Sequence, residues 1–224
     1  MPRTQEHAER YRDALTALAR IVGTAPRWRA TITKRIPVAA GLGGGSSDAA
    51  TALLLANPTL DAPLSPVRLR ALAAGLGADV PFFLADGPQF GRGDGSELAP
   101  LDLPQDYFVV LALARGAAKA STGTVYRAFD DRDGALGFEA RRRRLEEALA
   151  AVRRPRDLAA LPPNDLASSP LADELRSLGA FRADVSGAGP AVYALFHHRR
   201  QAQAARRALH GRADTWLTVP AWYG

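Results

Sequence analysis

The sequence of this 224-residue chain predicts an α+β protein with two lobes. Helix-like and strand-like segments mix along the chain without strict β-α-β alternation, which favours α+β over a doubly wound α/β fold. At roughly 150 residues per domain, the length corresponds to about one and a half domains. A Pro-bounded break at residues 100–105 separates two stretches with their own apolar patterns. We therefore expect an N-terminal lobe over residues 1–103 and a C-terminal lobe over residues 104–224.

The first lobe is expected to contain three helices, because apolar residues recur in it at helical spacing between glycine and proline boundaries. These helices cover residues 5–22, 46–55 and 67–76. Two strand-like segments accompany them: residues 28–36 alternate between apolar and polar, and residues 78–84 form a short apolar run. Glycine, aspartate and proline predict turns at residues 86–88 and 92–95.

The second lobe begins with a continuous apolar run at residues 107–113, which predicts a central strand. Shorter strands are expected over residues 183–187, 190–196 and 215–219. Helices are expected over residues 121–130, 136–152, 170–178 and 199–210. The strongly basic run at 141–144 continues into Leu-Glu-Glu, which is typical of the solvated face of a helix with Arg–Glu pairs.

Composition excludes several classes of protein. Cysteine is absent, which excludes disulfide scaffolds and thiolate metal sites. No apolar run reaches the roughly 20 residues that span a bilayer, and the start lacks the apolar core of a signal peptide. The positive charge behind the net +6 is almost entirely arginine, which suits phosphate ligands or nucleic acid, but a codon bias is the explanation we favour because Ala, Arg, Leu and Gly are abundant along the whole chain. Because no aromatic residues interleave with the basic run, we expect no nucleic-acid partner. We also expect no membrane partner, a cytoplasmic location and a monomer or homodimer.

The strongest motif is a glycine-rich run between the strand-like segment and the helix that follows it. It comprises Pro37, Val38, Ala39, Ala40, Gly41, Leu42, Gly43, Gly44, Gly45, Ser46 and Ser47. Glycines let a backbone turn tightly and bring its N–H groups close to a ligand, and a helix N-terminus attracts anions. The run therefore predicts a polyphosphate site, where the serine hydroxyls can donate hydrogen bonds or reach a magnesium ion. The alternative is an ordinary helix start with serine as the N-cap. No lysine follows the glycines, so the run is not the common P-loop.

Two further motifs carry candidate residues. Asp79 is the one carboxylate in the apolar stretch 76–84, where burial would make it a candidate base or metal ligand; the alternative is a turn aspartate. Residues 184–191 hold a second glycine-rich turn with Ser186, Gly187 and Gly189, and a simple strand-to-strand turn is the alternative there. The four histidines show no metal-ligand spacing with an acid, and we interpret them as surface residues.

The run Pro-x-x-x-Gly-Leu-Gly-Gly-Gly-Ser-Ser-x-Ala-Ala resembles the second motif of the galactokinase, homoserine kinase, mevalonate kinase and phosphomevalonate kinase superfamily. Its triple-glycine form is most similar to the branch that phosphorylates 4-diphosphocytidyl-2-C-methyl-D-erythritol. Residues 77–81 (Gly-Ala-Asp-Val-Pro) resemble the catalytic-aspartate segment, and residues 184–191 resemble the third glycine-rich motif, which packs against the nucleotide loop.

This resemblance implies a truncated N-terminal ribosomal-protein-S5-domain-2-like lobe and a C-terminal ferredoxin-like α/β sandwich lobe. It implies ATP and Mg²⁺ as cofactors and a small-molecule, cytidine-diphosphate-linked substrate, with Asp79 as the catalytic residue. Thr122 and Tyr126 match the cytidine side of the substrate pocket, although a capped helix with Tyr126 in the core is an alternative. The segment Asn164-Asp165-Leu166 resembles a family segment that we interpret as structural.

The first motif of the superfamily, a strand with a lysine and an asparagine followed by a Tyr-His pair, has no counterpart here. Only 36 residues precede Pro37, and neither Lys34 nor Lys119 matches the missing lysine. We expect a natural N-terminus further upstream; the alternative is a divergent chain that binds nucleotide with impaired catalysis. Another kinase of the same superfamily is the remaining alternative.

Overall fold

The computed structural model describes residues 3–37, 40–117 and 122–220, and for residues 3–9 it describes the backbone alone. The chain divides into two compact units. One unit comprises Met1–Val38 and Gly43–Asp102, and the other comprises Ala39–Leu42 and Leu103–Gly224. The border between the units therefore falls inside the glycine-rich run as well as near residue 103.

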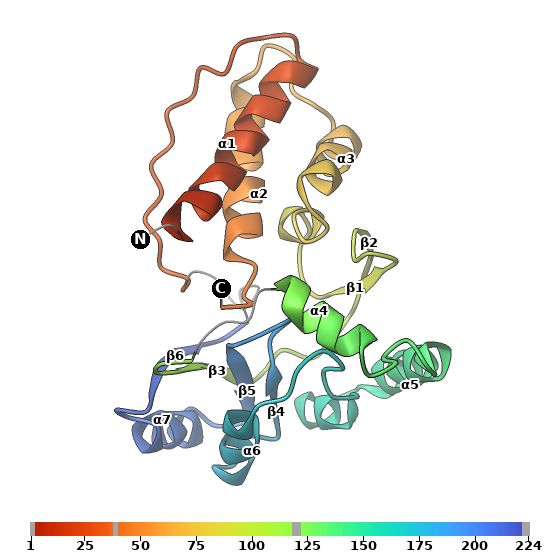
Figure 1. Ribbon diagram of the computed structural model, residues 1–224, viewed down its shortest axis with the longest axis vertical. Coiled ribbons are helices and arrows are strands. Elements are labelled where there is room, and N and C mark those ends of the chain that lie inside the picture. The colour runs from red at the N-terminus through yellow and green to blue at the C-terminus, as the bar shows by residue number, and fades with distance from the viewer. Residues whose placement is uncertain (1–2, 38–39, 118–121, 221–224) are drawn as a thin grey trace. The chain divides into compact units, whose positions relative to one another are not determined.

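The first unit is built around three helices (Figure 1). Its elements are α1 (Arg3–Ile21), α2 (Gly44–Ala56), α3 (Pro66–Leu76), the 3₁₀ turns η1 (Asn57–Thr59) and η2 (Pro81–Leu84), and the antiparallel hairpin β1 (Gln89–Arg92) and β2 (Glu97–Pro100). The core between α1 and α2 combines leucines with alanines that are fully buried, including Leu18, Ala49 and Leu53. Because alanine side chains are small, the two helix backbones can approach closely along this seam.

The structure corrects two expectations in this unit. The segment 24–35 is extended, but among the described residues no strand pairs with it, so the expected strand over 28–36 does not form. A side-chain bond holds it instead, because Trp28 Nε1 donates to Thr59 Oγ1 over 2.8 Å. The β-like stretch 78–84 is a turn followed by η2, in which Val80 and Pro81 are buried. Tight local bonds, such as Val80 N–H to the Gly77 carbonyl, replace a strand ladder there.

The second unit contains a four-stranded antiparallel sheet in the order β4-β5-β3-β6. Its elements are β3 (Phe108–Ala114), α4 (Thr122–Asp130), α5 (Phe138–Ala151), η3 (Pro155–Ala160), α6 (Pro170–Ser177), β4 (Arg182–Val185), β5 (Val192–Phe196), α7 (Arg199–Ala208) and β6 (Ala213–Thr218). The succession β, helices, β, β, α, β with the first strand inside the sheet is the ferredoxin-like arrangement. The expected central strand and the expected helices of this lobe are confirmed.

The two faces of the sheet are covered differently. Helices α6 and α7 pack on one face (Figure 1), where Val110, Leu175 and Phe196 are fully buried. The residues of alternate register, such as Leu195, face a smaller cluster with Val152 and the η3 turn. This alternation follows from the two-residue period of a strand, and it explains why β3 reads as a continuous apolar run.

No helix in the described part of the chain is both long and apolar enough to cross a membrane.

Candidate active site

The phosphate-loop candidate in the first unit is the start of α2. This 13-residue helix begins at Gly44, and Gly43 is its N-cap in the left-handed conformation with φ 65°. We expected the helix to begin at Ser46, and that boundary is wrong by two residues. The serine-cap alternative is also wrong, because no side chain caps the helix. The first N–H groups of a helix have no i−4 carbonyl to bond, so those of Gly44, Gly45 and Ser46 are available to a ligand. They coincide with the positive end of the helix dipole.

Close packing explains two of the glycines at this helix start. A Cβ atom on Gly43 would lie 2.8 Å from the ring of Phe83, which follows the aspartate segment. A Cβ atom on Gly44 would lie 3.3 Å from Ile36. The glycines therefore let α2 begin directly against the Phe83 ring and the chain that precedes the loop. No side chain larger than hydrogen fits at Gly43 without displacing that ring.

Arg10 of α1 connects the helix start with the aspartate segment. Its Nη1 donates to the Ser46 hydroxyl over 3.3 Å, and it lies 3.3 Å from the position that a Cβ atom would take on Gly77. The Gly77 backbone has φ 155°, which favours glycine, and the missing side chain leaves room for the guanidinium. Arg10 thus places a permanent positive charge beside the N-terminus of α2.

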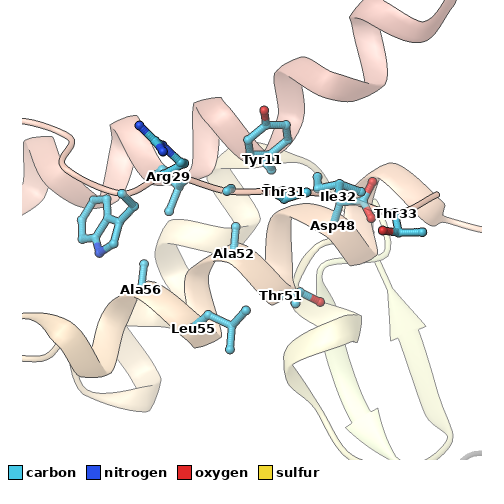
Figure 2. A pocket seen from close by; sticks show the side chains of 13 residues that line it. Tyr11, Arg29, Thr31, Ile32, Thr33, Asp48, Thr51, Ala52, Leu55 and Ala56 are labelled. Carbon is cyan, nitrogen blue, oxygen red and sulfur yellow. The ribbon is translucent and has the colours of Figure 1, made fainter.

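Lys34 brings a second positive charge to this region. It forms an ion pair with Asp48 in the second turn of α2, and its Nζ lies 3.9 Å from the Cβ position of Gly44. Both side chains are partly screened from solvent, with 32% and 19% of their surface exposed. Asp48 also lines a pocket of about 410 Å³ on the same unit, formed by α1, α2 and residues 28–33 (Figure 2). Figure 2 shows Asp48 and Thr33 at one end of this pocket and Leu55 and Ala56 toward the other.

Asp79 lies in the turn between α3 and η2, and its side chain is exposed. The burial that we expected from its apolar neighbours is wrong, because the turn buries Val80 and Pro81 and directs Asp79 to solvent. Its carboxylate is therefore accessible to a ligand or a cation. The segment that carries it contacts the helix start through Arg10 and Phe83.

In the second unit, the first glycine of the run packs against the other glycine-rich turn. The Ser186 hydroxyl donates to the Gly41 carbonyl over 2.8 Å, and the Ala191 N–H donates to the Ala40 carbonyl over 2.9 Å. Gly41 has φ 79°, and a Cβ atom on it would lie 2.4 Å from the Ser186 carbonyl oxygen and 2.9 Å from that of Gly189. Only glycine permits this approach.

The remaining candidate residues are exposed or half-buried, or they lie outside the described part of the chain. Thr122 and Tyr126 lie on α4 and are exposed, Tyr126 by 51%. The alternative that Tyr126 belongs to the core is therefore wrong. Val38 and Ala39 lie outside the described residues, and Pro37, Leu42 and Ser47 are half-buried in the run. Among the described residues, no group of three or more histidine and acidic side chains is arranged to hold a metal ion.

Several contacts at the site were not predicted from the sequence. Arg10 and Phe83 were missed because each meets the glycine run through tertiary packing rather than through a local pattern. Asp48 stands within the motif itself, and only its ion pair with Lys34 was missed. Lys34 was noted only as a poor match to the missing family lysine. Asn164 was interpreted as structural, and its amide bonds to the third glycine turn. Phe83 lies two residues after the aspartate motif of residues 77–81, and that proximity is the one signal that could have identified it.

Comparison with known proteins identifies the class to which this fold and these motifs belong. Two family models match: the GHMP kinases N-terminal domain over residues 8–87 and the GHMP kinases C-terminal domain over residues 138–214. The chain belongs to the GHMP kinase family. Within it, the chain is similar to curated proteins named 4-diphosphocytidyl-2-C-methyl-D-erythritol kinase.

The relative from Deinococcus radiodurans is 40% identical over 197 residues, which cover 84% of this chain and 64% of the relative. The one from Geobacter sulfurreducens is 37% identical over 222 residues, which cover 95% of this chain and 74% of the relative. The chain thus spans about two thirds to three quarters of these relatives' length.

Solved structures with a similar fold are also kinases. A crystal structure of 4-(cytidine 5'-diphospho)-2C-methyl-D-erythritol kinase superposes with a TM-score of 0.69 at 32% identity, covering 94% of this chain and 76% of the other. A mevalonate kinase superposes with a TM-score of 0.75 at 14% identity over 94% of this chain and 75% of the other, which is a likeness of fold.

Proposed function

We propose that this protein transfers the γ-phosphoryl group of ATP to the 2-hydroxyl of 4-diphosphocytidyl-2-C-methyl-D-erythritol. The observation that carries this proposal is the helix start at Gly43–Ser46, with free N–H groups and a nearby arginine, directly against the segment of Asp79. The names of the similar proteins support the choice of substrate.

The helix start fits the phosphates of ATP. Gly43 and Gly44 remove the side chains that would keep a ligand from the backbone, and the N–H groups of the first helical turn point out of the helix end. Arg10 adds positive charge beside it, and Lys34 lies nearby in its ion pair with Asp48. Phosphoryl transfer depends mainly on positioning and charge neutralisation, so these groups supply what the reaction requires.

Asp79 would accept the proton of the attacking hydroxyl. The hydroxyl oxygen forms a bond to the γ-phosphorus, the bond from that phosphorus to the β–γ bridging oxygen breaks, and ADP leaves. Mg²⁺, when bound, would neutralise charge on the phosphates. The serine hydroxyls of Ser46 and Ser47 are oxygen donors of the type that this hard cation prefers. Thr122 and Tyr126 would contact the cytidine side of the substrate as a polar group and a stacking ring.

A coupled assay of ADP release from the full 224-residue chain tests the proposal, with 4-diphosphocytidyl-2-C-methyl-D-erythritol, mevalonate and homoserine as separate acceptors. We expect ADP release that depends on the cytidine-linked acceptor alone. Loss of a general base costs about 10²- to 10⁴-fold in rate, so Asp79→Asn should lower kcat by that factor. Asp61→Asn is the matched control, because it removes another exposed carboxylate of the same unit.

Two outcomes would contradict the proposal. Turnover that prefers mevalonate or homoserine would assign the chain to another branch of the family. ATP binding by calorimetry without turnover of any acceptor would instead indicate a nucleotide-binding chain that lacks catalysis.

A further inference from the structure

The amide side chain of Asn164 braces the third glycine turn, residues 186–190. Its Nδ2 donates to the carbonyls of Val185 over 3.0 Å and Gly187 over 2.7 Å. Its Oδ1 accepts from the N–H of Leu166 over 2.7 Å, which closes the loop that carries Asn164 itself. Of the common side chains, only an amide of this length supplies two donors and an acceptor in this arrangement.

Asn164 is itself fixed by a buried acid. Its backbone N–H donates to Asp184 Oδ2 over 2.8 Å, and Oδ1 of the same carboxylate accepts from Val185 N–H over 2.8 Å. Asp184 is 8% exposed, and Arg182 Nη2 lies 3.5 Å from its Oδ2. Burying a carboxylate is costly unless it is paired and hydrogen-bonded, and here it is both. The position of Asn164 is therefore set by β4 as well as by its own loop.

The turn that Asn164 braces holds Gly41, the first glycine of the glycine-rich run. Ser186, one residue before Gly187, donates its hydroxyl to the Gly41 carbonyl. Gly187 lies near the same carbonyl, since a Cβ atom built on Gly187 would be 3.4 Å from it. All of these residues belong to the second unit. A continuous series of bonds thus runs from Asp184 through Asn164 and the glycine turn to Gly41.

We propose that Asn164 is a positioning residue for nucleotide binding: it holds the third glycine turn in the conformation that fixes the Gly41 end of the glycine run. Asn164 touches no reacting atom. It acts through Gly187 and Ser186 on a backbone that continues, after Leu42, into the N–H groups that would bind phosphate. This inference rests on the proposed function only for the assumption that ATP binds at the glycine run.

The chain offers a matched control for Asn164. Asn57, directly after α2 in the other unit, is buried where Asn164 is half-buried, and its amide likewise braces a loop: Nδ2 donates to the Leu64 carbonyl over 3.0 Å and Oδ1 accepts from Leu64 N–H over 2.8 Å. Replacing either residue with aspartate keeps the acceptor oxygen and removes the donors. Both changes should lower the melting temperature of the chain, but only the change at Asn164 disturbs the glycine turn.

The test compares Asn164→Asp and Asn57→Asp by titration with a fluorescent ATP analogue and by steady-state kinetics. We expect Asn164→Asp to weaken nucleotide binding about tenfold, which corresponds to 1.4 kcal/mol. It should raise the KM for ATP by a similar factor and change the KM for the acceptor much less. Asn57→Asp should leave nucleotide affinity unchanged. If both variants lose stability and neither loses nucleotide affinity, Asn164 is merely structural and the inference is wrong.

A second variant keeps the test decisive if Asn164→Asp does not fold. Ser186→Ala removes the bond at the other end of the series, on a half-buried side chain. Weakened nucleotide binding by this variant supports the inference, and wild-type affinity overturns it. The titration needs no turnover, so a chain that binds ATP without phosphorylating the acceptor would contradict the proposed function and leave this inference intact.

Discussion

Replacement of Gly41 with alanine should destabilise the chain by two separable effects. A left-handed backbone costs a residue with a Cβ atom about 1–2 kcal/mol, and Gly41 has φ 79°. The new Cβ atom would also lie 2.4 Å from the Ser186 carbonyl oxygen, closer than the 3.0 Å below which such contacts essentially never occur. The carbonyl must therefore move by at least about 0.6 Å, which strains the bonds from Ser186 Oγ and Ala191 N–H. Two hydrogen bonds at roughly 0.5–1.5 kcal/mol each add about 1–3 kcal/mol.

Gly211→Ala isolates the first effect. Gly211 has φ 80°, belongs to the same unit, and has no atom within 4 Å of its Cβ position. Both variants force alanine into an unfavourable backbone conformation, and only Gly41→Ala also displaces a carbonyl group. Thermal unfolding should place the melting temperature of Gly41→Ala about 2–12 °C below that of Gly211→Ala, at about 2–4 °C per kcal/mol. Equal melting temperatures would refute the close approach of the two glycine-rich segments.

Two further predictions concern single side chains. Arg10→Met should weaken binding of a fluorescent ATP analogue by roughly tenfold, because a charge-assisted bond at the helix start is lost. The control is Arg12→Met, which removes an exposed arginine of the same helix. Equal affinities of the two variants would contradict the role of Arg10. Hydrogen bonds from the backbone N–H groups of Arg154 and Arg153 lower the pKa of Asp157, so its stabilising effect is present above the ordinary value of 3.8 and is lost as the pH falls through the lowered value. Asp157→Asn should therefore melt below the wild type at pH 7, and a difference that persists well below pH 3.8 would argue against this linkage.

Local patterns in the sequence predict the helices that bury one face and the strand that is buried on both faces. The spacing of apolar residues finds α1, α3 and the second-unit helices, and the apolar run finds β3 as an inner strand. The segment 28–36 shows the limit of this reasoning. Its alternation is that of a strand, but a strand also needs a partner whose backbone groups complete the ladder. Whether a neighbouring strand is present depends on the tertiary structure, and the alternation of apolar and polar residues does not specify it.

The site shows the same limit at the level of single residues. The glycine run, Asp79 and the third glycine turn are visible in the sequence because each is a compact motif. The contacts that Arg10 and Asn164 make with these motifs are not, because Arg10 lies 36 residues from Ser46 and Asn164 lies 23 residues from Gly187. A resemblance can identify such a residue, as it did for Asn164, but the distant contact that the side chain makes leaves no local pattern. The apolar setting of Asp79 misled the prediction of burial, because a tight turn can bury its neighbours and still direct the carboxylate to solvent.

The glycines of the run are required for different physical reasons, and a phosphate ligand accounts for only part of them. A Cβ atom on Gly41 would clash with the backbone carbonyls of the third glycine turn, whereas a Cβ atom on Gly43 would clash with the ring of Phe83. These two contacts belong to different units, and the chain passes from one unit to the other between Leu42 and Gly43. The run is therefore constrained by packing at both of its ends, independently of any ligand. Substitution at Gly41 must act through the second unit and substitution at Gly43 through the aspartate segment, so the two should differ in which motif they disturb even where they lower nucleotide affinity alike.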